Sequence, residues 1–255
     1  MNVVITGGLG VLGERCAQAY LRTGAKVVIA DLQAEKDLDT AFNDEGGRLK
    51  YVQCDIRKYD DCKNLVMQSE LFFQEPIEVY IANAGVPFAG DFLDASQEQI
   101  QNVIHVNVLG SMYCAQTAIP SLIKNKQSHL IFTCSLQSTV ARSQRSIYTT
   151  SKHALAGLVK SLSLEFARQG LHVNGIAPAA IETPFLFSAF EGAKIANADG
   201  IKIAAESLPL GRIPNAEEFA ETALFLTSKA AASITGQLIN LDAGASAGIF
   251  PRQAI

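Results

Sequence analysis

Two residues that can move a proton lie four positions apart in the middle of the chain. Tyr148 and Lys152 fall in a stretch that predicts a helix over residues 146–169, and residues at i and i+4 share one helix face. A free phenol has a pKa of about 10, and a cation about 4 Å away lowers that pKa by up to about three units. The pair could then exchange a proton with a bound hydroxyl near neutral pH. Taken alone, the spacing also fits an ordinary solvated helix face.

The N-terminal segment has the order strand, glycine turn, helix, strand and acid. Residues 2–5 read as a short buried strand, residues 6–13 read Thr-Gly-Gly-Leu-Gly-Val-Leu-Gly, and a second apolar strand at residues 26–30 ends at Asp31. Glycines in this setting let backbone N–H groups approach a pyrophosphate at a helix N-terminus. The segment therefore predicts a dinucleotide site rather than a flexible turn before a helix.

Asp31 indicates which dinucleotide binds. A carboxylate at the end of the second strand accepts hydrogen bonds from ribose hydroxyls, whereas a 2′-phosphate would meet it as a like charge. Neither Leu9 nor Val11 in the glycine turn, nor Leu32 after the acid, supplies a cation for such a phosphate. We expect NAD.

Composition narrows the class of protein. The chain has 255 residues and a net charge of −4 without a basic cluster, so nucleic acid and membrane surfaces are not expected partners. Five scattered cysteines contain no Cys-x-x-Cys, which favours reduced thiols over disulfides or a metal site. No apolar run approaches 18 residues, and the strand at residues 2–5 leaves no room for a signal peptide. We expect a cytoplasmic protein with no metal.

Strand and helix patterns alternate along the whole chain without a linker, which predicts a single domain over residues 1–255. The alternation predicts an α/β fold, a doubly wound parallel sheet with helices on both faces. Residues 33–45 are charged and are expected to form a short exposed helix or loop. The remaining strands are expected at residues 48–54, 77–82, 129–134, 172–176 and 237–241, and the helices at 58–74, 96–124, 146–169 and 216–228.

These landmarks, in this order and spacing, resemble the short-chain dehydrogenase/reductase family over essentially the whole length. The family is a single Rossmann-type domain with a sheet of about seven strands, commonly assembled as homotetramers or homodimers. The residues that carry the resemblance are Thr6-Gly7, Asp55, Asn83-Ala84-Gly85, Asn107, Ser135, Tyr148-x-x-x-Lys152, Pro178, Ile181-Glu182-Thr183-Pro184, Thr235-Gly236-Gln237 and Asp242-Ala243-Gly244.

The resemblance implies a role for each catalytic position. Tyr148 would be the acid/base, and Lys152 would lower its pKa and hydrogen-bond the nicotinamide ribose. Ser135 would hold the substrate oxygen, and Asn107 would anchor a water in a proton relay. Asp55 would lie by the adenine, and Ile181 and Thr183 against the nicotinamide carboxamide. The full set implied to bind the cofactor is Gly7, Gly10, Val11, Leu12, Gly13, Asp31, Asp55, Ile56, Asn83, Ala84, Gly85, Tyr148, Lys152, Pro178, Ile181 and Thr183.

The chain departs from the family pattern at two places. Val11 stands where the middle glycine of Thr-Gly-x-x-x-Gly-x-Gly is usual, with Gly10 before it, and the turn is still expected to form. The Pro-Gly usual after the sixth strand is Pro178-Ala179 here, which reduces backbone freedom beside the nicotinamide. Neither change removes a catalytic group.

The implied reaction is interconversion of a secondary alcohol and its ketone, and the substrate itself stays open. Residues 184–209, with Phe185, Phe187 and Phe190, are expected to form a lid, although these rings could equally pack a core helix. Gln137 and Arg142 follow Ser135 much as in gluconate 5-dehydrogenases of the family, which points to a sugar acid or polyol. The phenylalanines favour a more apolar substrate, including a 3-oxoacyl group. We expect Ser135, Gln137, Tyr148 and Phe185 to contact the substrate. The non-enzymatic alternative is a dinucleotide sensor without turnover.

Overall fold

The structure is a computed structural model, and it describes residues 1–33, 46–187 and 196–248. These residues form a seven-stranded parallel sheet in the order β3-β2-β1-β4-β5-β6-β7. The fold class predicted from the sequence is confirmed. The strands are β1 (Asn2–Thr6), β2 (Lys26–Asp31), β3 (Leu49–Gln53), β4 (Val79–Ala82), β5 (Ser128–Thr133), β6 (Leu171–Pro178) and β7 (Leu238–Leu241).

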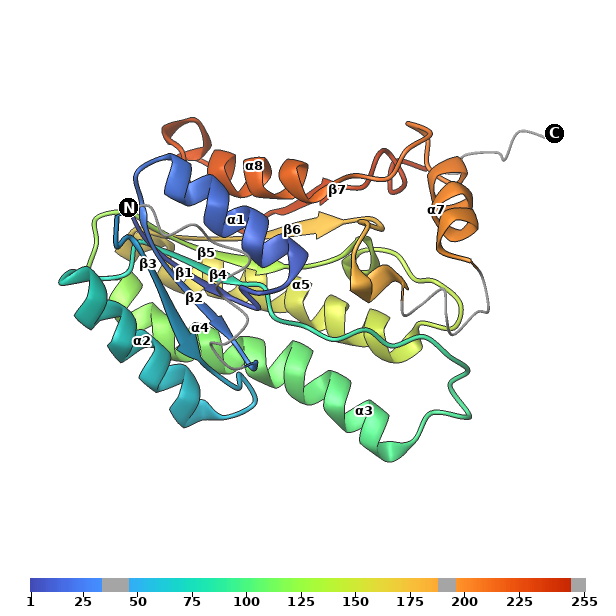
Figure 1. Cartoon of the computed structure of the whole chain (residues 1–255), viewed down its shortest axis with the longest axis horizontal. Helices are drawn as coiled ribbons and strands as arrows, with labels where there is room; N and C mark the ends of the chain where they lie inside the picture. The colour runs from blue at the N-terminus through green and yellow to red at the C-terminus, as the bar shows by residue number, and fades with distance from the viewer. Residues whose placement is uncertain (34–45, 188–195, 249–255) are drawn as a thin grey trace.

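Helices cover both faces of the sheet (Figure 1). On one face lie α1 (Val11–Arg22) and α8 (Ala216–Leu226), which pack against each other. On the other lie α2 (Tyr59–Phe73), α4 (Ser111–Leu122) and α5 (Ser146–Phe166). Since both faces are covered, the central strands are apolar on both sides: every residue of β1 and β4 is buried.

The strand order reverses between β1 and β4, which are neighbours in the sheet. From β1 the chain continues to β2 and β3 on one side, and β4 begins the run to β7 on the other. Ligands of doubly wound sheets bind beyond the carboxyl ends of the strands at such a reversal. The glycine turn follows β1, Asn83 follows β4, and Ser135 follows β5 within two residues, so all three lie at this edge.

The helix predicted over residues 96–124 is not continuous. It consists of α3 (Gln97–Ile104), a π-helical segment at His105–Gly110, and α4. A π segment inserts an extra residue into a helical turn and is frequent at functional sites. Here it contains Asn107, whose side chain bonds to a neighbouring loop and to α5. A periodic sequence pattern does not reveal this insertion because residues on both sides keep their apolar faces.

The other helix and strand boundaries agree with the sequence patterns to within two residues, apart from the end of α5. That helix ends at Phe166 and continues as a short 3-10 turn at Ala167–Gln169. Part of the segment at residues 184–209, which showed little periodicity, is the helix α7 (Asn197–Glu206). The expectation for residues 33–45 falls almost wholly outside the described residues.

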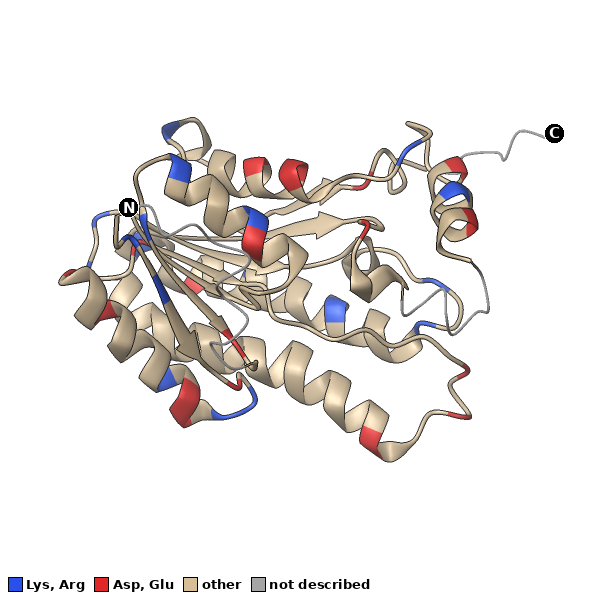
Figure 2. Cartoon of the chain, in the orientation of Figure 1, with Lys and Arg blue, Asp and Glu red and all other residues tan. Residues whose placement is uncertain are grey.

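Charge and hydrophobicity add two observations. Basic and acidic residues are interspersed along the described ribbon in Figure 2. None of the described helices is both long and apolar enough to span a bilayer.

Candidate active site

The glycine turn after β1 is held by close backbone contacts. Gly7 has a φ of +64°, which favours glycine, and a Cβ there would lie 2.9 Å from the Cα of Ala84. A Cβ on Gly13 would lie 2.2 Å from the carbonyl oxygen of Gly7. Both positions therefore require glycine for reasons of space, and the turn brings the first turn of α1 directly under the end of β1.

Val11 does not disturb this turn. It is the first residue of α1, with Gly10 as the N-cap in extended geometry, so its own backbone is helical and tolerates a side chain. A Cβ on Gly10 would meet nothing nearer than the Gly7 carbonyl oxygen at 3.3 Å. No side chain caps the helix, so the N–H groups of its first turn, which include Val11, Leu12 and Gly13, remain available to an anion.

Asp31 lies beside the same turn. One carboxylate oxygen accepts a hydrogen bond from the backbone N–H of Leu9 at 3.1 Å, and the other accepts from the N–H of Leu32 at 2.8 Å. Among the described residues no cation pairs with Asp31. The Oδ1 oxygen also accepts a long hydrogen bond from the N–H of Gln33 at 3.5 Å, whereas Oδ2 keeps a lone pair for a hydroxyl donor, which suits the ribose of a dinucleotide.

Asn83 ties three strands together at the carboxyl edge. Its amide nitrogen donates to the carbonyl oxygens of Thr6 at 3.0 Å and Gly7 at 3.1 Å, and its amide oxygen accepts from the Thr133 hydroxyl at 3.0 Å. The Thr6 hydroxyl accepts in turn from the backbone N–H groups of Asn83 and Ala84. The family landmark at residues 83–85 therefore fixes the glycine turn relative to β4 and β5.

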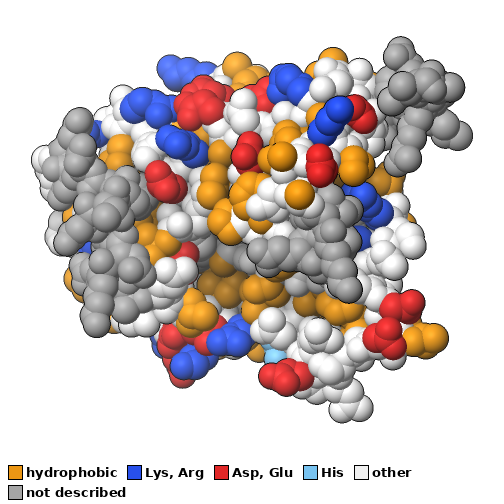
Figure 3. Space-filling model, turned by 45° about the vertical axis from the view of Figure 1, so that its right-hand side comes forward, with side chains coloured by type: hydrophobic (Ala, Val, Ile, Leu, Met, Phe, Trp, Pro, Cys, Tyr) orange, Lys and Arg blue, Asp and Glu red, His pale blue; other side chains and the backbone are white. Residues whose placement is uncertain are grey.

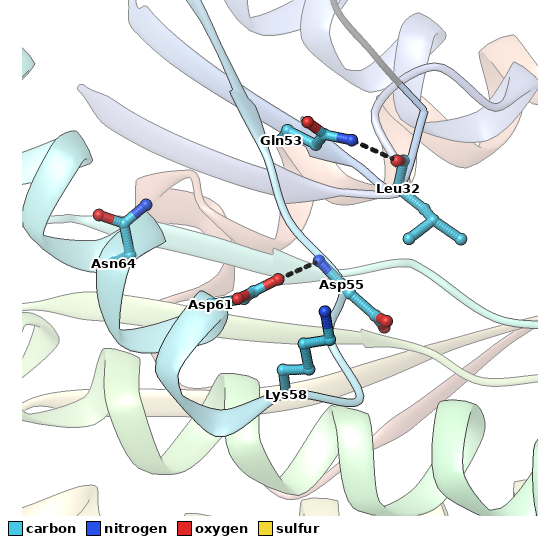
Figure 4. A pocket seen from close by; sticks show the side chains of 6 residues that line it. All are labelled: Leu32, Gln53, Asp55, Lys58, Asp61 and Asn64. Atoms are coloured by element: carbon cyan, nitrogen blue, oxygen red, sulfur yellow. Dashed lines mark hydrogen bonds between the residues drawn. The ribbon is translucent and has the colours of Figure 1, made fainter.

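A polar cavity of about 310 Å³ opens at the carboxyl edge of the sheet, beside the ends of β2 and β3 (Figure 4). Its lining includes Leu32 from the turn after β2, and Asp55, the residue expected by the adenine. Both oxygens of Asp55 accept hydrogen bonds from Arg57 at 2.8 Å, and this pairing lowers the carboxyl pKa. Ile56 is buried and lies directly against Gly110. The full lining is Leu32, Gln53, Asp55, Lys58, Asp61 and Asn64.

Ser135 and Tyr148 come together although 13 residues separate them. Ser135 caps the 3-10 helix η3 (Leu136–Ser138), and its hydroxyl oxygen accepts from the N–H of Gln137 at 3.1 Å. The Ser135 hydroxyl lies near the Tyr148 phenol, close enough to lower its pKa. The tyrosine ring is buried and meets the ring of Phe185 edge-on, with the centroids 5.7 Å apart.

Lys152 is buried below Tyr148 on the same face of α5. Its Nζ lies 5.6 Å from the centroid of the tyrosine ring and donates to the carbonyl oxygen of Thr133 at 2.8 Å. Within the described ranges no carboxylate forms an ion pair with it. Gly85 faces this group, because a Cβ there would lie 3.8 Å from Nζ.

The pKa values of this pair differ from the sequence expectation. Burial raises the pKa of Tyr148 to about 12, although the nearby Ser135 hydroxyl acts to lower it. Burial also lowers the pKa of Lys152 to about 8. The prediction that Lys152 lowers the pKa of the Tyr148 phenol is therefore wrong. Both groups lose their solvation on burial, and this loss raises the phenol pKa.

The Asn107 side chain bonds both to the loop at Val86 and to α5. Its amide oxygen accepts from the N–H of Val86 at 2.8 Å, and its amide nitrogen donates to the Val86 carbonyl at 3.0 Å and to the Ser151 hydroxyl at 3.1 Å. The Ser151 hydroxyl donates to the backbone carbonyl of Tyr148 at 2.7 Å. The π segment is thereby connected to the backbone of the tyrosine itself.

The remaining expected residues are placed around this centre. Pro178 ends β6, and the side chain of Ile181 is buried in the core. The Thr183 hydroxyl donates to the Ile181 carbonyl at 3.1 Å. Phe185 and Phe187 lie at the described start of the expected lid, while Phe190 lies outside the described residues.

Figure 3 shows hydrophobic side chains gathered around a hollow in the face that lies beyond the strand ends. Exposed apolar residues of the loops at this edge include Phe92 and Val140, as well as Phe185, which is 39% exposed. An apolar mouth around a few convergent polar groups is typical of a small-molecule site.

Comparison with known proteins agrees with this arrangement. A family model described as enoyl-(acyl carrier protein) reductase matches residues 10–246. The chain belongs to the short-chain dehydrogenase/reductase family. It is therefore an oxidoreductase of that family, and Ser135, Tyr148 and Lys152 occupy one contiguous site in it.

Three relatives illustrate the similarity. Short chain aldehyde dehydrogenase 1 of Euphorbia lathyris is 34% identical over 95% of this chain and 87% of its own length. The structure of the ligand-free aldohexose dehydrogenase of Thermoplasma acidophilum superposes with a TM-score of 0.88 at 28% identity, covering 97% of this chain and 95% of that one. The 3-ketoacyl-(acyl-carrier-protein) reductase of Brucella melitensis complexed with NADH gives 0.86 at 26%, covering 96% and 97%.

Sequence reasoning missed Thr133, Thr149 and Ser151. Each bears a hydroxyl group and bonds to a residue that the sequence had singled out. The Thr133 carbonyl accepts from Lys152, the Thr149 hydroxyl donates to Gln137, and the Ser151 hydroxyl accepts from Asn107. Ser151 could have been found, because it precedes Lys152 directly and lies three residues after Tyr148 on one helix face.

The glycine turn gives a first prediction. We expect Gly13→Ala to abolish NADH binding or lower its affinity at least tenfold, because its Cβ would overlap the Gly7 carbonyl and displace the turn. Gly10→Ala should change NADH affinity less than threefold. Titration of intrinsic or NADH fluorescence measures both. Gly157→Ala, in open space on α5, is the control, and should raise the free energy of unfolding by roughly 0.5–1 kcal/mol. Equal affinities of the Gly10 and Gly13 variants would contradict the proposed turn.

Proposed function

We propose that the protein interconverts a secondary alcohol and its ketone with NAD as the hydride carrier. The observation that carries the proposal is the buried Tyr148 phenol, which has the Ser135 hydroxyl nearby and the Lys152 ammonium 5.6 Å from its ring centroid. This set lies at the edge of the sheet that also holds the glycine turn. A dinucleotide bound at the glycine turn would therefore extend to the place where Ser135 and Tyr148 would hold the substrate oxygen.

The residues present fit a dinucleotide. The glycine turn leaves no room for side chains at Gly7 and Gly13, and the uncapped N-terminus of α1 offers N–H groups to a pyrophosphate. Backbone N–H groups fix the Asp31 carboxylate where it can accept hydrogen bonds from ribose hydroxyls. When bound, NAD accepts or supplies the hydride, and the chain's own residues do the rest.

In ketone reduction the protein's task is to give a proton to the carbonyl oxygen. Ser135 orients that oxygen by a hydrogen bond, and Tyr148 donates its phenolic proton to it as the carbon accepts the hydride. The developing phenolate is stabilised by the Lys152 cation on the same helix face. In alcohol oxidation the same groups act in reverse, and the phenolate accepts the hydroxyl proton.

Asn107 supports this centre through the backbone. Its three side-chain hydrogen bonds hold the loop at Val86 and the helix α5 at Ser151 in fixed register. The Ser111 hydroxyl donates to its carbonyl oxygen at 2.8 Å. A water anchored near the π segment, as the family resemblance implies, would complete a relay from Lys152.

The substrate class has two candidate forms. Gln137 near Ser135 favours an oxygen-rich substrate, such as the sugar acid or polyol inferred from the sequence, and the structural similarity to an aldohexose dehydrogenase supports that form. The apolar mouth and the similarity to a 3-ketoacyl reductase support a 3-oxoacyl substrate. Arg142 is exposed on the loop after η3, where it can still meet a carboxylate at the rim.

The assembly and the lid belong to the same proposal. We expect a homotetramer or homodimer acting on a small molecule in the cytoplasm, in a single domain whose residues 184–209 close over the substrate. A dinucleotide-binding protein without turnover is the competing function. NADH binding without oxidation or reduction of any alcohol, sugar acid or 3-oxoacyl thioester would favour that competitor.

Tyr148→Phe tests the acid/base role. We expect kcat to fall by about 10²- to 10⁴-fold, because the variant loses only the proton-transferring oxygen. NADH affinity and the melting temperature should stay close to those of the wild type. Steady-state kinetics with NADH fluorescence titration measures both quantities. Retention of more than a tenth of the wild-type kcat would show that another group transfers the proton.

The pKa directions predict different pH profiles for the two reaction directions. With the pKa of Tyr148 at about 12, the phenolate needed for oxidation becomes about tenfold more abundant per pH unit, so the oxidation rate should rise from pH 6 to 8. Above about pH 8 the Lys152 cation is lost, and the rise should flatten. Reduction uses the protonated phenol, which persists throughout this range, so its rate should be flat from pH 6 to 8. Above about pH 8 the reduction rate should fall, because the Lys152 cation that stabilises the developing phenolate is lost. A flat oxidation profile from pH 6 to 8 would contradict this assignment.

Asp31 and Leu32 test the cofactor preference. The wild type should show a kcat/KM at least tenfold higher with NAD than with NADP, because the carboxylate repels a 2′-phosphate. Asp31→Ser combined with Leu32→Arg should reverse the preference by removing the anion and adding a cation. Leu32→Arg alone is the control for the added charge. Equal kcat/KM values for the two cofactors in the wild type would refute the NAD preference.

Ser151→Ala tests whether Asn107 acts through the tyrosine backbone. Ser151 and Ser163 are both buried on α5, and each bonds its hydroxyl to the carbonyl three residues earlier. Only Ser151 also accepts from Asn107. We expect Ser151→Ala to lower kcat about tenfold with little change in KM for NADH, and Ser163→Ala to change kcat less than twofold. Equal effects on kcat would reduce Ser151 to a helix-stabilising residue.

A further inference from the structure

Arg145 is a half-buried cation beside the proposed acid/base centre. It occupies the N-cap of α5, three residues before Tyr148, and its Nη1 donates to the backbone carbonyl of Phe88 at 3.1 Å. The backbone N–H of Gly90 donates to the carbonyl of Gln144 at 3.0 Å, so two hydrogen bonds join the loop after β4 to the segment just before α5. Arg145 is therefore held against this loop.

The contact with Phe88 places the guanidinium near the tyrosine. The Phe88 ring is buried and packs in one apolar cluster with Tyr148. Burial is the main cause that raises the pKa of Tyr148, and the charge of Arg145 acts to lower it. Burial likewise lowers the pKa of Arg145, and Tyr148 acts to raise it. The guanidinium and the phenol are therefore close enough to interact electrostatically.

Within the described ranges no carboxylate forms an ion pair with Arg145. The loop that it holds carries Asp91 and Asp94, which are exposed and not paired with it, and the first turn of α5 has no acidic residue. Arg142 adds a like charge nearby. A half-buried guanidinium without a counter-ion is unfavourable, and an anion that forms next to it relieves that cost.

The groups around the phenol differ in the pH range over which they are charged. Cys134, directly after β5, stays a neutral thiol because burial raises its pKa to about 11. Lys152 loses its proton above about pH 8, because burial lowers its pKa. An arginine stays protonated at every pH at which a protein is normally folded. Arg145 therefore supplies positive charge near Tyr148 both below and above pH 8.

We propose that Arg145 is a second cation of the acid/base centre, which stabilises the Tyr148 phenolate together with Lys152 and continues to do so after Lys152 has lost its charge. This inference rests on the proposed function. Arg145 lies about one helical turn before Tyr148, and Lys152 lies about one turn after it. In alcohol oxidation both cations favour the phenolate that accepts the hydroxyl proton. In ketone reduction both favour the release of the phenolic proton to the carbonyl oxygen.

The first test measures the ionisation of residue 148 without any substrate. Tyr148 is replaced by 3,5-difluorotyrosine, whose phenol is more acidic than that of tyrosine, and the fluorine NMR shift of this single label is followed from about pH 6 to pH 10. We expect Arg145→Gln and Arg145→Met each to lower the acid dissociation constant of the phenol by about three- to tenfold, because both remove the cation. Arg145→Lys should keep the constant within about twofold of the wild-type value, because it keeps the charge.

These variants separate charge from hydrogen bonding. Arg145→Gln can still donate to the Phe88 carbonyl but carries no charge, Arg145→Lys can donate and is charged, and Arg145→Met can do neither. Arg142→Gln is the matched control. Arg142 is exposed on the same loop, so water and salt screen its charge, and its loss should change the dissociation constant by less than about twofold. Melting temperatures and NADH affinities close to those of the wild type would show that the variants are folded.

The second test measures turnover of an uncharged alcohol, cyclohexanol, so that no substrate anion can pair with the arginine. We expect Arg145→Gln to lower kcat for its oxidation by about three- to tenfold with little change in KM, and by the same factor at about pH 7 and pH 9, because arginine does not titrate between them. Arg145→Lys should restore kcat at about pH 7. The fluorine titration decides the inference by itself where cyclohexanol is a poor substrate.

Two outcomes of the titration would overturn the inference and leave the oxidoreductase function in place. One is an equal dissociation constant in Arg145→Gln and the wild type. The other is agreement of Arg145→Gln with Arg145→Lys while only Arg145→Met differs, since the hydrogen bond to Phe88 would then be the cause.

Two kinetic outcomes are also decisive. An unchanged kcat for cyclohexanol in Arg145→Gln, with loss of activity on sugar acids, would make Arg145 a binding residue for a substrate carboxylate and overturn its role at Tyr148. Failure to turn over any alcohol, ketone or 3-oxoacyl thioester would overturn the proposed function, and with it the catalytic use of this cation. The titration would still show whether Arg145 acts on the phenol, so the two failures are distinguishable.

Discussion

The burial of an ammonium group without a carboxylate partner is the constraint on which the site depends. Lys152 has lost its water, and among the described side chains and backbone groups it holds one hydrogen bond, to the Thr133 carbonyl. Such a cation is costly in the protein interior, and its pKa falls to about 8. Any developing negative charge nearby relieves that cost, and the Tyr148 phenol lies one turn before Lys152 on the same helix face.

The surrounding structure keeps this cation where it is. Thr133 ends β5 and also donates through its hydroxyl to Asn83, so the carbonyl that holds Lys152 belongs to the same hydrogen-bonded edge as the glycine turn. Asn107 binds α5 from the opposite side through Ser151. Movement of β5, β4 or the π segment would therefore displace the ammonium, the tyrosine and the dinucleotide turn together.

The two ends of the site have different electrostatic characters. The end with Tyr148 and Lys152 is buried and largely apolar, so charges formed there interact strongly. The end with Asp31 and Asp55 is more open, and it is lined by charged and amide side chains around the cavity shown in Figure 4. This division suits a ligand with a polar adenosine half and a reacting half that must be kept from water.

The sequence by itself determined the fold class, the order of the elements and the groups of the proposed site. Periodicity of apolar residues is set by which faces are buried, so Val3 to Ile5 and the helix at Tyr148 could be placed from pattern alone. The glycine spacing also followed from the sequence, because only a glycine fits where two backbones meet. The family motif singled out Asn107 and Ser135, and the strand pattern singled out Asp31, without any coordinates.

Only the tertiary structure decided what those groups do to each other. The pKa of Tyr148 rises because burial removes its water, and burial is a property of the packed chain rather than of a spacing of four residues. The π segment at Asn107, the Arg57 pairing of Asp55 and the Thr149 bond to Gln137 all join groups through side-chain geometry. Residues distant in sequence come into contact only when the strands pair in their register, and no local sequence pattern encodes that contact.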